Sequence, residues 1–129
     1  MINSSVYNYI NVLDKAADAA WLRNEAITNN IANADTPGYK RQDISFEGEL
    51  KKAMKVSRYE SVDAKVADLK SRDLQARTYT DYDSVSYRLD GNNVDIQTEN
   101  VTLVKNQLKY NGLVQSANQE FSNLKMVMK

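Results

Sequence analysis

Two residue types that often carry catalysis, metal binding or cross-linking are absent from this chain of 129 residues. It contains no cysteine and no histidine, and only a single proline, a single tryptophan and four glycines. Without cysteine the chain has no disulfide framework and no thiolate chemistry. Without histidine it lacks the usual general base near neutral pH and the commonest metal ligand. We therefore expect neither a cofactor nor a metal site.

Net charge and long apolar runs are lacking as well. The 17 Lys and Arg residues balance 17 Asp and Glu residues, so charge gives no reason to expect nucleic acid or an anionic membrane surface as a partner. No apolar run approaches the roughly 20 residues of a membrane-spanning helix. Residues 1–21 lack the basic start and apolar core of a secretory signal peptide. Composition alone predicts a soluble cytosolic protein of one domain.

The remaining candidates for chemistry are weak. Asp81 and Asp83 flank Tyr82, but two carboxylates at this spacing are typical of a solvated strand edge. The run 90–95 superficially resembles a calcium-binding loop. However, Val94 occupies a position that needs an Asp or Asn ligand, and Gly91 comes too early in the run. We therefore assign no catalytic, cofactor-binding or metal-binding residue, and the enzyme class is disfavoured.

Apolar or small residues recur near the N-terminus at alternating spacings of four and three, which predicts a helix over about 5–33. The apolar seam on one face of this helix consists of Val6, Ile10, Leu13, Ala17, Ala20, Asn24, Ile27 and Ile31. Asn24 is its one polar member. A polar residue in such a seam more often fixes the register of packing than binds a ligand.

The C-terminal region repeats the pattern over about 98–128. Its predicted seam consists of Ile96, Asn100, Leu103, Gln107, Tyr110, Val114, Ala117, Phe121, Leu124 and Met128. Gly112 costs about 1 kcal/mol in a helix relative to alanine, but the seam keeps its phase across it, so we expect a single helix. Asp95 and Thr98 are both candidates for its N-cap.

The matched lengths and seams predict a mainly α fold, in which the two terminal helices pair as an antiparallel, coiled-coil-like hairpin. Both helices also carry apolar residues outside the seam and few charges. Such faces fit the core of a protein–protein interface. They fit equally well a domain whose central segment folds over them, and the sequence leaves both interpretations open.

The central segment divides into three parts. An amphipathic pattern predicts a short helix over 46–56, and the charged stretch 57–76 is either a solvent-facing helix or a loose linker. Residues 78–96 predict a small β-hairpin with a turn at 90–93. Its strand would contain Val85, Tyr87 and Leu89, and its return Val94 and Ile96.

These elements predict two units. The first is a discontinuous helical core of 1–39 plus 94–129, and the second is an insertion of 40–93.

The end of the first predicted helix carries the densest stop signal in the chain. Pro37 cannot donate a backbone hydrogen bond and disfavours a helical conformation at Thr36. With Gly38 and Tyr39 these residues suit a type II turn, which takes proline at its second position and glycine at its third.

This run resembles the N-terminal signature of the flagellar rod and hook family of bacterial axial proteins. The signature residues are Asn29, Asn30, Ile31, Ala32, Asn33, Thr36, Pro37, Gly38 and Tyr39, and the likeness continues through 40–47. A second matching motif precedes the last helix and consists of Asp90, Gly91, Asn92 and Asn93, leading into 94–95. A third lies at 105–110, whereas 58–87 has no counterpart.

The resemblance implies a structural subunit of the proximal rod of the flagellar basal body rather than an enzyme. Subunits of this family stack their terminal helices into a helical shaft. The implied partners are further copies of the chain, the rod protein FlgC, the adapter FliE, the membrane-ring base and the flagellar type III export apparatus. The implied location is the basal body in the cell envelope and periplasmic space, reached without a cleaved signal peptide. This overrules the cytosolic location that composition suggests.

One short pattern resembles the motif that the export gate reads in early substrates, with Phe46 followed four residues later by Leu50. The same two residues fit the buried face of the short central helix, so both interpretations stay open. Two alternatives to the rod assignment also remain at this point. One is another subunit of the same family, such as FlgC, and the other is a cytoplasmic helical-hairpin adaptor.

Overall fold

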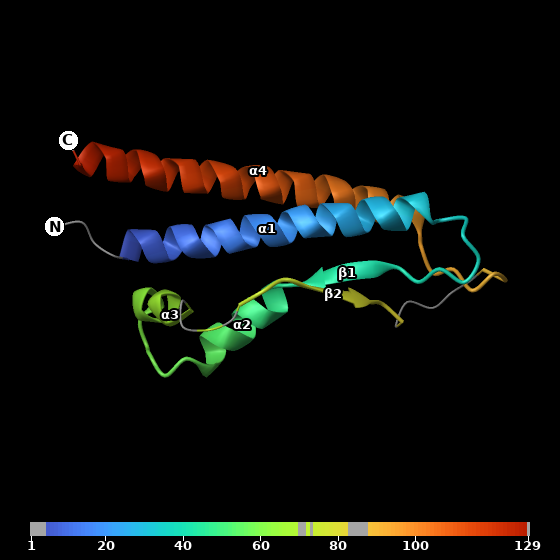
Figure 1. The fold of residues 1–129 in the computed structure, drawn as a ribbon, viewed down its shortest axis with the longest axis horizontal. Coiled ribbons are helices and arrows are strands. Elements are labelled where there is room, and N and C mark those ends of the chain that lie inside the picture. Colours follow the sequence, from blue (N-terminus) through green and yellow to red (C-terminus); the bar gives the residue numbers. More distant parts are fainter. Residues whose placement is uncertain (1–4, 70–71, 73, 83–87, 129) are drawn as a thin grey trace.

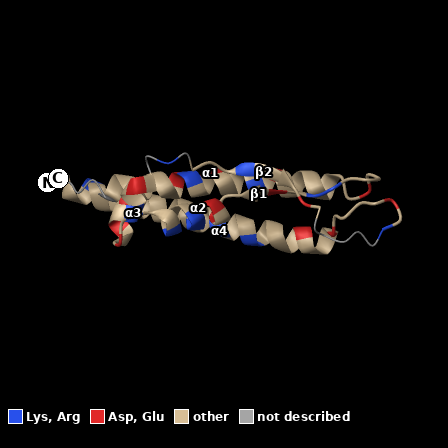
Figure 2. Ribbon diagram, turned by 90° about the horizontal axis from the view of Figure 1, so that it is seen from below, with Lys and Arg blue, Asp and Glu red and all other residues tan. Residues whose placement is uncertain are grey.

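The computed structural model describes residues 5–69, 72, 74–82 and 88–128. In chain order the elements are α1 (Ser5–Ala32), β1 (Gln42–Ser45), α2 (Glu47–Val56), α3 (Val62–Asp68), β2 (Arg77–Thr80) and α4 (Ile96–Val127). The two long helices lie side by side and antiparallel, and α2, α3 and the two strands lie along the other side of α1 (Figure 1). Most of both long helices carries no charged residue (Figure 2).

The predicted fold class is confirmed: the protein is mainly α, with paired terminal helices, a short central helix and a two-stranded antiparallel sheet. The bounds of both long helices agree with prediction within two residues, and α4 continues through Gly112. Its N-cap is Asp95, whose Oδ1 accepts hydrogen bonds from the backbone N–H groups of Gln97 and Thr98 at 3.1 and 3.4 Å. The structure thus decides between the two candidate caps.

The buried face of α4 differs from the predicted seam. The buried residues of this helix are Glu99 and Asn106, whereas the predicted seam positions Asn100 and Gln107 are exposed. Leu103, Tyr110, Val114, Ala117 and Leu124 are half-buried, and Ile96, Phe121 and Met128 are exposed. Periodicity gave the wrong face at Asn100 and Gln107, because the neighbouring Glu99 and Asn106 find hydrogen-bond partners in the interior, which offsets the cost of burying them.

The central segment covers the second apolar face of α1. Ala19 of α1 is buried against Phe46, Leu69 and Leu74, with Val12, Ala16, Leu50, Ala53, Met54 and Ala76 packed around them. For α1, therefore, folding of the middle of the chain accounts for the extra apolar face. The outer face of α4 has no such cover, since Val101, Val104 and Leu108 are exposed.

The sheet joins segments that are far apart in the sequence. β1 pairs with β2 in antiparallel register, with Gln42 opposite Thr80 and Ser45 opposite Arg77. The sheet is therefore not the local hairpin predicted over 78–96.

The predicted return strand is also absent, because Val94 is buried in irregular chain and Ile96 begins α4. Val85 and Tyr87 lie outside the described residues. A turn is present two residues earlier than the predicted 90–93, at Arg88–Gly91, where Gly91 has φ +78° and its N–H donates to the Arg88 carbonyl. The described residues of 57–76 contain one short helix, α3, capped by the Ser61 hydroxyl.

A charged contact connects the helices with the start of α2. Arg23 of α1 donates to both carboxylate oxygens of Glu47 at 2.6 and 2.7 Å, and to the Ile44 carbonyl at 2.8 Å. Lys109 of α4 also donates to Glu47. The hydrogen bonds from Arg23 lower the pKa of the Glu47 carboxyl from an ordinary 4.5 to about 2, against the opposing effect of burial and with help from Lys109.

We expect Glu47→Gln to lower the free energy of unfolding at pH 7 by less than about 1 kcal/mol, because the Glu47 carboxylate is partly exposed and screened. A carboxyl whose pKa is lower in the folded state stabilises the fold above pH 4.5 and loses that effect as the pH falls toward 2. Denaturant titrations of both proteins should therefore converge over this window. Glu49→Gln is the control, since Glu49 lies in the same turn of α2 and forms no ion pair within the described part of the chain. A difference that persists at pH 2 would contradict the expectation.

Candidate functional site

The two signature motifs meet at the end of the helix pair where α1 stops and α4 starts. We call this region the junction and define it by Asn30, Tyr39, Arg41, Asn92, Asn93 and Glu99. Its residues come from three separate parts of the sequence. Hydrogen bonds within the junction hold those parts together.

Asn92 lies at the centre of the junction and is completely buried. Its amide nitrogen lies 2.8–3.0 Å from the carbonyl oxygens of Asn33, Ala34 and Thr36, in the segment that follows α1. Its Oδ1 accepts the N–H of Val94 at 2.8 Å. Each of these carbonyls also accepts from a second donor, the Thr36 N–H, Arg88 and the Tyr39 N–H respectively, so Asn92 adds bonds that hold the two motifs together.

The turn after α1 has the geometry that its sequence predicts. Gly38 has φ +73°, and the Tyr39 N–H donates to the Thr36 carbonyl at 3.2 Å. The Gly38 N–H in turn donates to the Asp90 carbonyl at 2.7 Å. A Cβ on Gly91 would lie 3.8 Å from the Gly38 Cα, so the two motifs approach each other through their glycines.

Asn30, the last buried residue of α1, binds the chain that leaves the turn. Its Oδ1 accepts the Gln42 N–H and its Nδ2 donates to the Gln42 carbonyl, both at 2.8 Å. The Tyr39 hydroxyl donates to the same Oδ1 at 3.1 Å. Burial, together with the charge of Glu99, raises the pKa of the Tyr39 hydroxyl. Asn30 therefore aligns β1 with the end of α1.

A buried ion pair connects α4 to this arrangement. Arg41 donates from Nε to Glu99 Oε1 at 2.7 Å and from Nη1 to Asp81 at 2.7 Å. Asn93 Oδ1 accepts the Arg41 N–H at 2.8 Å, and its Nδ2 donates to the Asp81 carbonyl at 2.8 Å. Burial opposes the charge on Arg41, but the hydrogen bonds to Glu99 and Asp81 outweigh it and raise the pKa of the guanidinium.

Not all signature side chains are buried in the junction. Asn29, Ala32, Thr36, Pro37 and Gly38 are exposed, whereas Ile31 and Asn33 are half-buried. The charges of the junction are carried by Arg41, Asp81 and Glu99. Asp81, predicted to lie at a solvated strand edge, is half-buried instead, and Arg41 and Glu99 were not among the predicted site residues. Glu99 lies on the buried side of a helix start, and its only sequence signal is that it is one of the few acidic residues in α4.

The junction has the properties of a structural joint. Arg41, Asn92, Asn93 and Glu99 also line a hollow of about 770 Å³ beside the start of α4, but their polar groups are bonded to one another and to backbone. Among the described residues, no group of three or more acidic side chains is placed to hold a metal ion. Within the same part of the chain, no helix is both long and apolar enough to cross a membrane.

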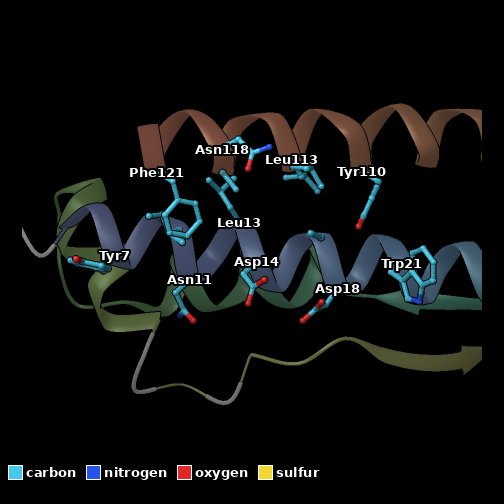
Figure 3. A pocket seen from close by; sticks show the side chains of 14 residues that line it. Tyr7, Asn11, Leu13, Asp14, Asp18, Trp21, Tyr110, Leu113, Asn118 and Phe121 are labelled. Carbon is cyan, nitrogen blue, oxygen red and sulfur yellow. The ribbon is translucent and has the colours of Figure 1, made fainter. Parts of the chain in front are cut away.

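The predicted seam of α1 lines a groove between the two long helices, with a volume of about 760 Å³. Ile10, Leu13 and Ala17 contribute from α1, and Tyr110, Val114, Ala117 and Phe121 from α4. Towards the junction, Ala20 and Ile27 are buried and Asn24 is half-buried; at the opposite end of α1, Val6 is half-buried. In Figure 3, Tyr110 and Phe121 point from α4 toward α1. Trp21, more than half exposed, lies at one edge with its ring 6.2 Å from that of Tyr110.

Comparison with known proteins gives consistent matches. A family described as "Flagella basal body rod protein" matches residues 10–40. The flagellar basal body rod protein FlgB of Bacillus subtilis is 37% identical over 118 residues, which are 90% of this chain and 89% of that protein. FlgB of Borreliella burgdorferi is 36% identical, over 87% of this chain and 89% of that protein. FlgB of Escherichia coli K12 is 37% identical, over 68% of this chain and 69% of that protein.

We expect Asn92→Asp to lower stability more than Asn92→Ala. Alanine removes the contacts to the three carbonyls and leaves the buried Val94 N–H without its Oδ1 acceptor, and an unsatisfied buried group costs about 1–3 kcal/mol. Aspartate additionally places carboxylate oxygens against those carbonyls. Thermal and denaturant unfolding of the purified proteins would measure both changes. Asn29→Asp, at an exposed position of the same signature, is the matched control and should leave the free energy of unfolding within about 0.5 kcal/mol. Equal stability of the Asn92→Asp and Asn29→Asp proteins would contradict the role of Asn92.

Proposed function

Because this chain belongs to the FlgB family of flagellar basal body rod proteins and is a structural rod subunit, we propose that α1 and α4 build the shaft by packing against neighbouring subunits. It is located at the flagellar basal body and associates with other rod components. A helical assembly requires heterologous contacts that do not close on themselves. Each subunit must then offer two different surfaces.

The observation that carries this proposal is the apolar surface that the fold leaves uncovered on its long helices. Trp21 of α1 and Val101, Val104 and Leu108 of α4 are each more than half exposed. Large apolar side chains gathered on one part of a soluble surface mark an interaction site. The central segment covers only one face of α1, so it leaves the α4 face free for another subunit.

The neighbours we propose are further copies of the chain, the rod protein FlgC, the adapter FliE and the membrane-ring base. We also propose that the chain reaches the envelope through the flagellar type III export apparatus without a cleaved signal. Its lack of cysteine supports passage as an unfolded chain, because no disulfide can trap it. Residues 1–39 with 94–129 would form the axial core, and 40–93 the insertion that covers α1. The cytoplasmic adaptor has no observation in its favour.

We expect Val114→Asp to reduce the yield of rods by about tenfold or more, since a charge buried without a partner costs well over the 1.4 kcal/mol that a tenfold change represents. Val114 is half-buried in the groove between the helices. The measurement is swimming and basal-body yield in a deletion strain that carries the variant. Ser122→Asp, at an exposed position of the same helix, is the control and should assemble. Normal swimming with Val114→Asp would count against packing through this surface.

The two residues of the predicted export motif are covered in the folded chain. Phe46 is buried in the core, and Leu50 packs against the same cluster. We therefore propose that the export gate reads these residues before the chain folds.

We expect Phe46→Leu to lower export severalfold while it lowers stability by about 1–2 kcal/mol, because leucine keeps an apolar core residue but removes the aromatic ring. Leu69→Val, in the same core cluster but outside the motif, supplies a control with a similar loss of stability. Secreted and retained protein would be compared by immunoblot in a rod-deficient strain. If the two variants lose export equally, Phe46 acts only through the core.

A further inference from the structure

One face of α1 stays open after α4 and the central segment have covered the other two. It borders the groove between α1 and α4, and Asp14 and Asp18 lie along the edge of that groove (Figure 3). Glu25 is exposed further along the same helix. The open face of α1 is therefore acidic, with Trp21 as its large apolar side chain.

The groove continues toward the junction into a hollow of about 280 Å³, which shares Trp21 and Tyr110 with it. Asn106 is 96% buried there, at 4% exposure. Its Nδ2 donates to the Ala20 carbonyl at 2.7 Å, but its Oδ1 and the buried Oδ1 of Asn24 accept no hydrogen bond within the described part of the chain. We call these two oxygens the notch; each has less than 1 Å² of exposed area.

The outer side of α4 offers a matching surface on the same molecule. Val101, Val104 and Leu108 are 55%, 56% and 67% exposed, and their spacing of three and four residues places them in one stripe. Lys105 is exposed within this stripe. Lys105 takes part in none of the ion pairs that the described residues form. The stripe thus combines apolar contact area with one ammonium group, which suits an acidic groove.

Building on the rod-subunit function, we propose that the groove binds the α4 stripe of a second copy of this chain. Val101, Val104 and Leu108 pack against Trp21 and Tyr110, and Lys105 pairs with the acidic edge formed by Asp14 and Asp18. The stripe at 101–108 and the notch at Asn106 lie at the same height along the axis of α4, so the second copy lies beside the first. Groove and stripe are different surfaces, so the contact repeats instead of closing as a dimer.

Cysteine pairs test this contact directly, because the chain contains no native cysteine. A double variant with Asp18→Cys and Leu108→Cys has one thiol at the groove and one in the stripe. The two positions lie on different helices, and Leu108 faces away from the interior, so we expect bonds between copies and not within one. Mild oxidation of basal bodies should give a ladder of covalent oligomers, and each single variant should give none. Glu49→Cys with Leu108→Cys is the matched control, since Glu49 is exposed on α2.

The outcomes separate this contact from the rod function itself. A ladder in rods that contain the double variant supports the contact. Monomer alone in such rods overturns it and leaves the rod function intact. Absence of the unmodified chain from purified rods would overturn both.

Charge reversal provides a second test that needs no cross-link. Lys105→Glu and Asp18→Lys should each lower rod yield by about tenfold, and their combination should recover most of it. Lys125→Glu, at an exposed position outside the stripe, is the control. A double variant no better than either single one would overturn the pairing of these surfaces.

Discussion

The carboxylate of Glu99 is almost completely removed from water, and the arrangement of both ends of the chain depends on how that charge is compensated. A buried charge is tolerated only with a partner and further hydrogen bonds. Arg41 supplies the partner, and the amide of Asn30 adds a hydrogen bond to the second oxygen at 3.3 Å. These bonds fix where α4 starts relative to where α1 ends. The pairing of the long helices follows from that constraint.

The polar junction and the apolar surfaces therefore have different tasks in this subunit. The junction is held by its own hydrogen bonds, and the Asn92 amide nitrogen lies within 3.0 Å of three carbonyl oxygens there. Away from the junction, the two long helices are packed together mainly through small and aliphatic side chains, and they carry exposed apolar residues. A subunit built in this way has one rigid end, and it has helices whose remaining surfaces are suited to neighbours. This agrees with a family that builds the rod of the flagellar basal body.

Much of the fold could be predicted from local signals, and the errors have specific causes. The stop signal around Pro37, the cap at Asp95 and the long periodic segments depend on neighbouring residues, so helix bounds agreed within two residues. The hairpin over 78–96 was wrong because β2 pairs with β1, more than 30 residues earlier in the chain. The α4 seam was wrong at Asn100 and Gln107 because Glu99 and Asn106 are buried instead. Hydrophobic periodicity cannot detect polar residues that find partners across the fold.

By itself, the sequence determined the class of fold, the two long helices, the tight turn at Gly38 and the likeness to flagellar axial proteins. All of these follow from residue type and spacing within a short stretch of chain. Only the tertiary structure decided that the two signature motifs bind each other, that Arg41 and Glu99 form the buried pair, and that the middle of the chain covers α1 but not the outer side of α4. Those contacts join residues that are distant in sequence, and they are set by the geometry and burial of partners that no local pattern specifies.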